Sequence, residues 1–162
     1  MSIRIATIDD LSHIVAIYNE TISDRIATAD TETIAVQSRH AWFEQHKHNR
    51  PLWVIEINHQ IAGWLSLQDF YGRPAYNATA EVSIYVGKSF RGKGIGRKLL
   101  SHLLQSCPQH KVENLVAFVF AHNKPSINLF IQHGFKQWGL LPQVAKLDDQ
   151  KKDLMILGLR IT

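Results

Sequence analysis

Three glycines and several cations lie together in the segment Arg91-Gly92-Lys93-Gly94-Ile95-Gly96. This segment falls between a predicted strand that ends near Val86 and a predicted helix that begins near Lys93. Because glycine has no side chain, the backbone N–H groups of such a turn can approach an anion closely. The helix N-terminus adds partial positive charge, and Arg91, Lys93 and Arg97 add formal charge. We therefore predict a phosphate-binding turn.

A glycine-rich turn is by itself a weak signal. The spacing is not the Gly-x-Gly-x-x-Gly of nicotinamide sites, and no Gly-Lys-[Ser/Thr] follows as in a P-loop. A turn that only lets a strand and a helix pack tightly is the alternative interpretation.

Composition narrows the class of ligand. The length of 162 residues fits one domain with a sizeable core. The net charge of that domain is +4. Basic residues gather at Arg91, Lys93, Arg97 and Lys98, and we find no nucleic-acid-binding motif. We therefore expect a phosphorylated small molecule and no nucleic acid.

The sequence has no apolar run of the roughly 18 residues that span a membrane, and no secretion signal. We therefore expect a cytoplasmic protein without a membrane partner. The single Cys107 agrees with a reducing compartment and is expected to be a structural thiol.

Hydrophobic periodicity orders the elements as β-α-α-β-β-β-α-β-α-β-β, a mixed α/β sheet with helices on both faces. In the strand 80–86, Glu81, Ser83 and Tyr85 point away from the apolar face. The other predicted strands are about 2–6, 52–57, 61–70, 115–120, 135–144 and 153–161, and the predicted helices are about 9–22, 34–47, 93–106 and 123–133.

A second motif runs from Asn123-Lys-Pro-Ser126 to Gly134-Phe135. Together with the turn, it resembles the GCN5-related N-acetyltransferase (GNAT) superfamily over nearly the whole chain. The resemblance implies one N-acetyltransferase domain over residues 1–162 with the GNAT fold, a mixed and mostly antiparallel sheet flanked by helices. It also implies acetyl-CoA as co-substrate, with its pyrophosphate on the turn, and no metal.

The segment Ala75-Tyr76-Asn77-Ala78-Thr79-Ala80-Glu81 is similar to the phosphinothricin N-acetyltransferase group. This narrower resemblance implies acetylation of the free amine of a small amino-acid-like substrate, such as phosphinothricin, methionine sulfoximine or a related L-amino acid. Relatives in this group are commonly homodimers, and we expect one here. The apolar stretch Leu154 to Ile161 could supply the interface or be an interior strand.

Glu81 is the predicted general base. An α-amine with a pKa near 8 is mostly protonated at neutral pH, and a placed carboxylate can take its proton directly or through one water. Strand parity puts Glu81 on the non-core face, where the family motif places a base. A solvated or salt-bridged strand glutamate is the alternative interpretation.

The resemblance also assigns residues to acetyl-CoA. Main-chain groups of the strand end would pair with the pantetheine arm and donate to an oxyanion, which requires this strand to diverge from the strand 115–120. Helix capping alone would also explain Asn123. The predicted cofactor-binding residues are Ile84, Tyr85, Val86, Arg91, Gly92, Lys93, Gly94, Ile95, Gly96, Arg97, Asn123 and Ser126.

The chain departs from its relatives at three positions. Phe130 stands where many relatives carry a Tyr or His general acid, so we assign no acid. The alternatives are that the thiolate leaves unaided, or that water or Tyr85 helps. Asn77 and Lys152 stand where some relatives carry Arg and Trp, so we expect recognition of the acceptor to differ from theirs. The predicted substrate-binding residues are Arg73, Tyr76 and Asn77, with Arg73 offering a bidentate fork.

The remaining candidates receive structural interpretations. The histidines around His46 lack a metal-binding spacing and are expected to be solvated on a polar helix face. Trp42, Trp53 and Trp64 are expected to be core aromatics. Peptide N-terminal or other small-amine acetylation, and a CoA-binding module with little activity, remain alternative functions.

Overall fold

The computed structural model describes residues 1–161. It confirms the predicted order of strands and helices. The elements are β1 (Ser2–Ile5), α1 (Leu11–Ile22), α2 (His40–Glu44), β2 (Leu52–Ile57), β3 (Gln60–Asp69), β4 (Thr79–Val86), α3 (Ile95–Ser106), β5 (Asn114–Phe120), α4 (Lys124–Gln132), β6 (Lys136–Leu147) and β7 (Gln150–Arg160). Short 3-10 turns connect them at Ile8–Asp10, Val36–Arg39, Pro74–Tyr76, Lys88–Phe90 and Cys107–His110.

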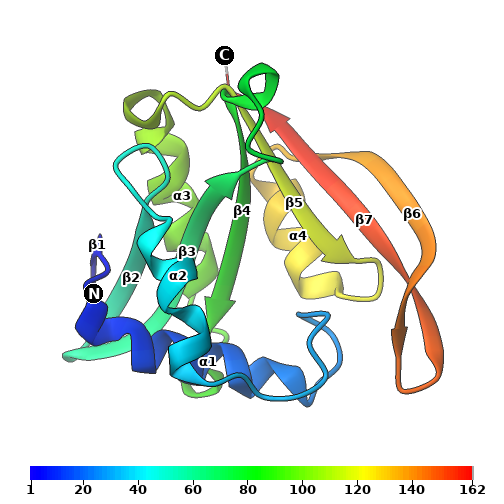
Figure 1. The fold of residues 1–162 in the computed structure, drawn as a ribbon, viewed down its shortest axis with the longest axis horizontal. Helices are drawn as coiled ribbons and strands as arrows, with labels where there is room; N and C mark the ends of the chain where they lie inside the picture. Colours follow the sequence, from blue (N-terminus) through cyan, green and yellow to red (C-terminus); the bar gives the residue numbers. More distant parts are fainter. Residues whose placement is uncertain (162) are drawn as a thin grey trace.

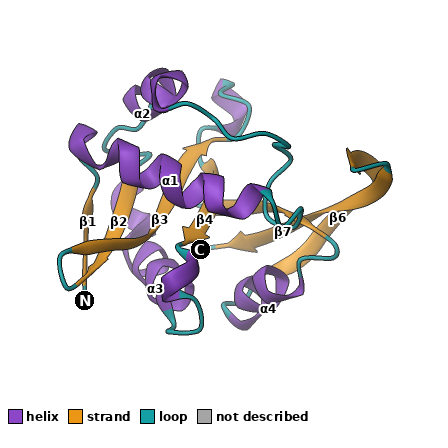
Figure 2. Ribbon diagram, turned by 90° about the horizontal axis from the view of Figure 1, so that it is seen from below, coloured by secondary structure: helices purple, strands orange, loops and turns teal. Residues whose placement is uncertain are grey.

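The strands form one seven-stranded sheet in the order β1-β2-β3-β4-β5-β7-β6. Only β4 and β5 pair in parallel, and the other neighbours are antiparallel, so the predicted mixed and mostly antiparallel sheet is confirmed. Helices α1 and α2 cover one face, and α3 and α4 cover the other (Figures 1 and 2).

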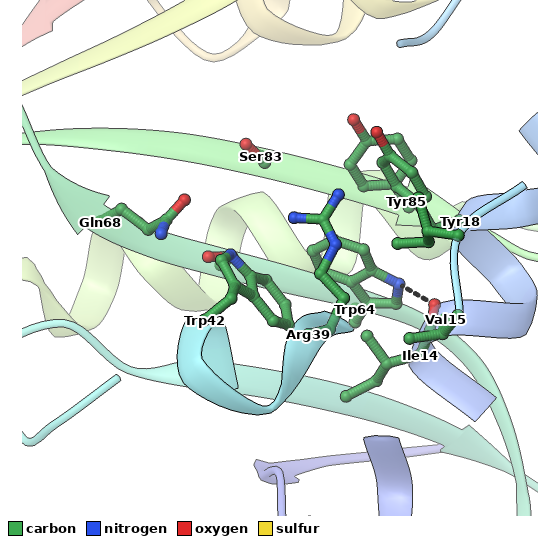
Figure 3. A pocket seen from close by; sticks show the side chains of 11 residues that line it. Ile14, Val15, Tyr18, Arg39, Trp42, Trp64, Gln68, Ser83 and Tyr85 are labelled. Carbon is green, nitrogen blue, oxygen red and sulfur yellow. Dashed lines mark hydrogen bonds between the residues drawn. The ribbon is translucent and has the colours of Figure 1, made fainter. Parts of the chain in front are cut away.

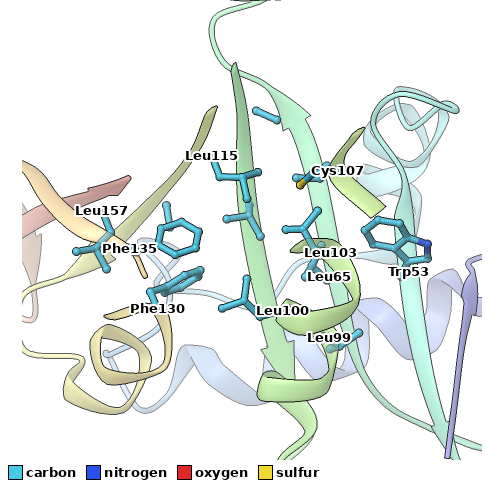
Figure 4. Close-up of a cluster of buried hydrophobic side chains, with 14 of the residues drawn as sticks. Trp53, Leu65, Leu99, Leu100, Leu103, Cys107, Leu115, Phe130, Phe135 and Leu157 are labelled. Atoms are coloured by element: carbon cyan, nitrogen blue, oxygen red, sulfur yellow. The ribbon is translucent and has the colours of Figure 1, made fainter. Parts of the chain in front are cut away.

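The larger core lies between the sheet and helices α3 and α4 (Figure 4). Helix α3 turns its leucines inward at the spacing of one helical face, and Phe130 and Phe135 extend the cluster under β5 and β7. Cys107 is fully buried there, and burial raises the pKa of its thiol to about 11. It is therefore a packing residue, as predicted.

The predicted helix 34–47 was too long. Asn19 on α1 accepts from the N–H of Ile34 at 2.9 Å and donates to its carbonyl at 3.0 Å. The second bond occupies the Ile34 carbonyl, which would accept an intrahelical hydrogen bond in a helix that began there, and Ala35 is extended. The chain therefore makes a 3-10 turn at Val36–Arg39 before the short helix α2.

The C-terminal hairpin is longer than predicted. Asp148 and Asp149 both have positive φ, 50° and 67°, and form a two-residue turn. β6 and β7 therefore continue up to this turn. β7 lies between β5 and β6, so the stretch from Leu154 is an interior strand, and β6 forms the sheet edge.

Candidate active site

The parallel strands β4 and β5 diverge, as the resemblance required. They pair only where Thr79–Glu81 faces Asn114–Val116, although β4 continues to Val86 and β5 to Phe120 (Figure 1). Beyond the last pair, the main chain of β4 has no strand partner on this side. Its free N–H and C=O groups can pair with an extended ligand as an added strand would.

A cavity of about 680 Å³ extends from this divergence to the N-termini of α3 and α4. It gathers every predicted cofactor residue except Lys93, whose ammonium lies 5.5 Å from the centre of the Phe90 ring. The predicted residues that line it are Ile84, Tyr85, Val86, Arg91, Gly92, Gly94, Ile95, Gly96, Arg97, Asn123 and Ser126.

The glycine turn is shaped as an anion cradle. Gly92 and Gly94 have φ of 76° and 77°, and a Cβ on either would project into open space. Gly94 is the N-cap of α3, so the free N–H groups of the first helical turn face the cavity end. Gly96 has a packing role, because a Cβ there would lie 3.0 Å from the Leu129 side chain of α4.

Charge at the turn is partly balanced by an acid that sequence reasoning missed. Asp24, just after α1, lines the large cavity and lies 3.5 Å from Arg91 and 3.9 Å from Lys88. The main-chain N–H of Lys88 also donates to Glu20 at 2.9 Å. These contacts tie the end of α1 to the phosphate turn. No motif in the sequence signalled them.

At the start of α4, Asn123 caps the helix by accepting from the Ser126 N–H at 3.3 Å. Both residues also line the gap of about 50 Å³ between the diverging strands. Phe130 is buried, with its ring 4.9 Å from that of Phe135. A ring without a polar atom in this place gives the site no proton donor.

Glu81 is the last residue of β4 that pairs with β5, and it lies opposite Gln68 of β3 and Val116 of β5. Its side chain is half-buried, and burial raises the pKa of its carboxyl. Within residues 1–161 it makes no ion pair or side-chain hydrogen bond. The salt-bridged alternative is therefore not observed.

A second cavity, of about 150 Å³, lies on the opposite face of the sheet under α1 and α2 (Figure 3). Tyr85 lines both cavities, and Ser83 lines both this one and the gap between the strands. The two cavities therefore meet at β4. The side chains around the small one are Ile14, Val15, Tyr18, Ile34, Arg39, Trp42, Trp64, Ser66, Gln68, Ser83 and Tyr85.

The small cavity corrects two expectations. Trp42 and Trp64 are cavity walls as well as packing residues, with ring centres 5.5 Å apart. His46 is half-buried rather than solvated, with a ring nitrogen 2.6 Å from the Ser66 hydroxyl. Trp53 is a core aromatic, as predicted. Arg39 was missed because no motif surrounds it.

Tyr85 directs its side chain to the α1 side, with its ring 5.1 Å from that of Tyr18. Burial raises the pKa of its phenol, and its hydroxyl donates to the Ala27 carbonyl at 3.4 Å. It therefore stays protonated at neutral pH.

The predicted substrate residues Arg73, Tyr76 and Asn77 are exposed in the β3–β4 connection and line none of these cavities. The Asn77 carbonyl accepts from Arg50 at 2.6 Å. Lys152 lies on β7, paired with Ala145 of β6. The structure thus gathers the cofactor set but not the substrate set.

Among residues 1–161, no group of three or more His, Cys, Asp or Glu side chains is placed to hold a metal ion. None of the helices in this range has both the length and the apolar character to cross a membrane.

The profile of the Acetyltransferase (GNAT) family matches residues 14–135. This span contains β4, which lines both cavities, and also the phosphate turn and α4. The chain belongs to the GNAT family. Its predicted fold and its class, an acetyl-CoA-dependent acyltransferase, are thereby confirmed.

Individual relatives named as acetyltransferases are similar to this chain over nearly its whole length. YwnH of Bacillus subtilis, provisionally named a phosphinothricin acetyltransferase, is 50% identical over 159 residues, 98% of each chain. An L-methionine sulfoximine/L-methionine sulfone acetyltransferase of Salmonella typhimurium is 32% identical, over 99% of this chain and 95% of its own. A phosphinothricin acetyltransferase of Sinorhizobium meliloti, solved with acetyl-CoA, superposes with a TM-score of 0.91 at 27% identity, covering 98% of this chain and 87% of that one.

Proposed function

We propose that this GNAT enzyme transfers acetyl from acetyl-CoA to the free amine of a small amino acid or analogue, such as phosphinothricin or methionine sulfoximine. The observation that carries the proposal is the meeting of two unlike cavities at β4. One is large and ends in an anion cradle, and the other is small and lined mostly by apolar and aromatic side chains. The relatives reported above are named for phosphinothricin or for L-methionine sulfoximine and L-methionine sulfone as acceptors.

The large cavity fits acetyl-CoA. Open space over Gly92 and Gly94 leaves room for a pyrophosphate against the first turn of α3, with Arg91 and Arg97 at the same end. The main chain of Ile84 to Val86, which has no strand partner on the β5 side, would hold the pantetheine, and Asn123 and Ser126 would border it. When bound, acetyl-CoA supplies an activated thioester carbonyl.

In the proposed reaction the amine nitrogen bonds to the acetyl carbon, the carbon–sulfur bond breaks, and CoA leaves as a thiolate. Glu81 accepts the proton that the ammonium must lose. It shares a strand face with Ser83, and residues two apart on a strand are separated by roughly 6.6 Å. A single water can therefore connect Glu81 to an amine held at Ser83.

No side chain is proposed as the acid. With Phe130 buried and the Tyr85 pKa raised, the thiolate leaves without a protein donor. It takes up, through water, the second proton that the attacking nitrogen loses as the amide forms. A thiol pKa near 8.5 makes this feasible at neutral pH.

A thiol-release assay with acetyl-CoA tests the function. Phosphinothricin, methionine sulfoximine, common L-amino acids and a peptide amine are compared side by side at equal concentration. We expect CoA release with at least one of the small acceptors. Release with the peptide alone would replace the small-acceptor proposal by peptide acetylation. Binding of acetyl-CoA without release on any amine would indicate a CoA-binding module.

We also propose that two copies associate through the edge strand β6. It exposes several apolar side chains, Trp138, Leu140, Leu141 and Val144. Exposed apolar groups clustered on an edge strand favour a covering partner. Sedimentation should give the mass of two chains, and Leu141→Lys should reduce it to one. A wild-type mass of one chain would contradict this association.

A further inference from the structure

Arg39 is the one charged residue among the described side chains that line the small cavity. It ends the 3-10 turn Val36–Arg39, and its guanidinium points into the space between Trp42 and the two tyrosines, with Ser83 beyond it (Figure 3). All other walls are apolar, aromatic or neutral polar groups. The lining of the cavity therefore contains one formal positive charge, and its ion-pair partner Asp30 is not part of the lining.

The guanidinium has hydrogen-bonding capacity to spare. Within residues 1–161 it donates no hydrogen bond to a protein acceptor, and its ion-pair partner Asp30 is 3.6 Å away. The carboxylate of Asp30 already accepts from the hydroxyl of Tyr18. Since a guanidinium has five N–H donors in a planar fork, Arg39 can offer a bidentate contact to an incoming oxyanion.

Aromatic rings hold the guanidinium in place. Its central carbon lies 5.0 Å from the Tyr18 ring centre and 5.7 Å from that of Trp42. The side chain is only 28% exposed, so part of its hydration is already lost. A cation fixed in this way loses little further entropy when it binds an anion.

The backbone that carries Arg39 is also fixed. Upstream, the two hydrogen bonds of Asn19 hold Ile34 against α1. Downstream, Trp42 packs on Trp64, and His46 is bonded to Ser66 of β3. Arg39 is therefore positioned by contacts to both α1 and the sheet.

We propose that Arg39 binds the oxyanion of the acceptor and so makes the enzyme selective for free amino acids over amines that lack one. This inference rests on the proposed acetylation of a small amine. It assigns the acceptor's two ends: the amine at Ser83, within reach of Glu81, and the carboxylate or side-chain oxyanion at Arg39. A cavity of about 150 Å³ suits a molecule of amino-acid size.

Arg73 is the rival for this role. It is exposed in the β3–β4 connection and lines neither cavity. The variants Arg39→Gln and Arg73→Gln therefore test which of the two arginines binds the acceptor oxyanion. Arg160→Gln, at the exposed end of β7, serves as the neutral control.

The experiment measures kcat and KM at saturating acetyl-CoA for L-methionine sulfone, its carboxamide derivative and phosphinothricin. We expect Arg39→Gln to raise KM for L-methionine sulfone about 10- to 100-fold with kcat little changed, because a charge-assisted contact is lost. The carboxamide should be affected less than threefold, and Arg39→Lys should recover part of the loss. Phosphinothricin has two oxyanions and shows which one Arg39 binds. If Arg39→Gln raises KM for phosphinothricin as much as for L-methionine sulfone, the α-carboxylate is bound. A larger rise in KM for phosphinothricin indicates the phosphinate.

A binding measurement separates this inference from the function. Trp42 and Trp64 line the cavity, so L-methionine sulfone should change the tryptophan fluorescence without acetyl-CoA, and more weakly in Arg39→Gln. Circular dichroism checks that each variant is folded. Equal acid-to-amide KM ratios in Arg39→Gln and wild type, or loss of the ratio in Arg73→Gln instead, would overturn the inference. Acceptor-dependent fluorescence without CoA release would overturn only the proposed reaction.

Discussion

The two cavities that meet at β4 are built in different ways. The large one offers a ligand main-chain groups, from a glycine turn, the first turn of α3 and the edge of β4 that faces β5. The small one is formed by side chains from α1, the α1–α2 connection, α2, β3 and β4. A main-chain site constrains residue types within a short segment, whereas a side-chain site can be assembled from distant positions. Substitutions should therefore affect the two cavities separately.

The largest expected effect is at Glu81, which precedes by two residues the part of β4 where the cavities meet. Glu81→Gln should lower kcat/KM about 10²- to 10⁴-fold at neutral pH, because the proton acceptor is lost. Burial raises the pKa of Glu81, so wild-type activity should fall as pH drops through that raised value. At high pH the amine is already deprotonated, and the variant should partly recover. Glu113→Gln, an exposed control, should match wild type across pH. An unchanged profile for Glu81→Gln would remove it as the base.

Next is the main-chain cavity. Gly94→Val should weaken acetyl-CoA binding about tenfold or more, since a β-branched residue at φ 77° costs about 1–2 kcal/mol and displaces the cradle N–H groups. Acceptor-induced tryptophan fluorescence should stay unchanged, which would sharpen the separation of the cavities. Gly134→Val imposes the same kind of strain at φ 92°, away from the turn. If calorimetry finds the same loss of acetyl-CoA affinity for both variants, general destabilisation accounts for it.

A smaller and opposite effect is expected from Asp24→Asn. Removing this carboxylate frees Arg91 and Lys88 for phosphate, so acetyl-CoA affinity should rise a few-fold at low salt. Added salt should erase most of the gain. Asp149→Asn, whose partner is Lys146, should show no change. A weaker affinity for acetyl-CoA in Asp24→Asn would mean that the contact of Asp24 with Arg91 and Lys88 helps binding by holding the turn against α1, and that this effect exceeds the gain from freeing the two cations.

The smallest expected effect is on stability. Because burial raises the pKa of Glu81 in the folded state, its contribution to stability is fully present below the unfolded value and is lost as pH rises through the folded value. Glu81→Gln should therefore raise the melting temperature slightly at neutral pH and not at pH 4. Thermal unfolding at the two pH values measures this. A lower melting temperature at neutral pH would show that the carboxylate is stabilised by its surroundings.

The fold was largely readable from local patterns. The strand and helix order followed from hydrophobic periodicity, and the α4 cap from Asn123 at the right offset. One error arose where a distant side chain fixes the backbone. The two hydrogen bonds of Asn19 hold Ile34 outside the helix, so only Val36 to Glu44 of the expected helix 34–47 is helical. The turn at Asp148 and Asp149 has positive φ at both residues, and the residue types alone did not predict this conformation.

The site divides in the same way. The sequence by itself determined the phosphate turn, because glycines, a helix start and cations must be neighbours along the chain to build a main-chain cradle. Only the tertiary structure decided the small cavity. Arg39, Trp42, Trp64 and Ser83 come together through the packing of α1 and α2 on β3 and β4, and no spacing in the chain records that contact. Side-chain sites depend on which faces of distant elements meet, and those contacts form only when the sheet is covered.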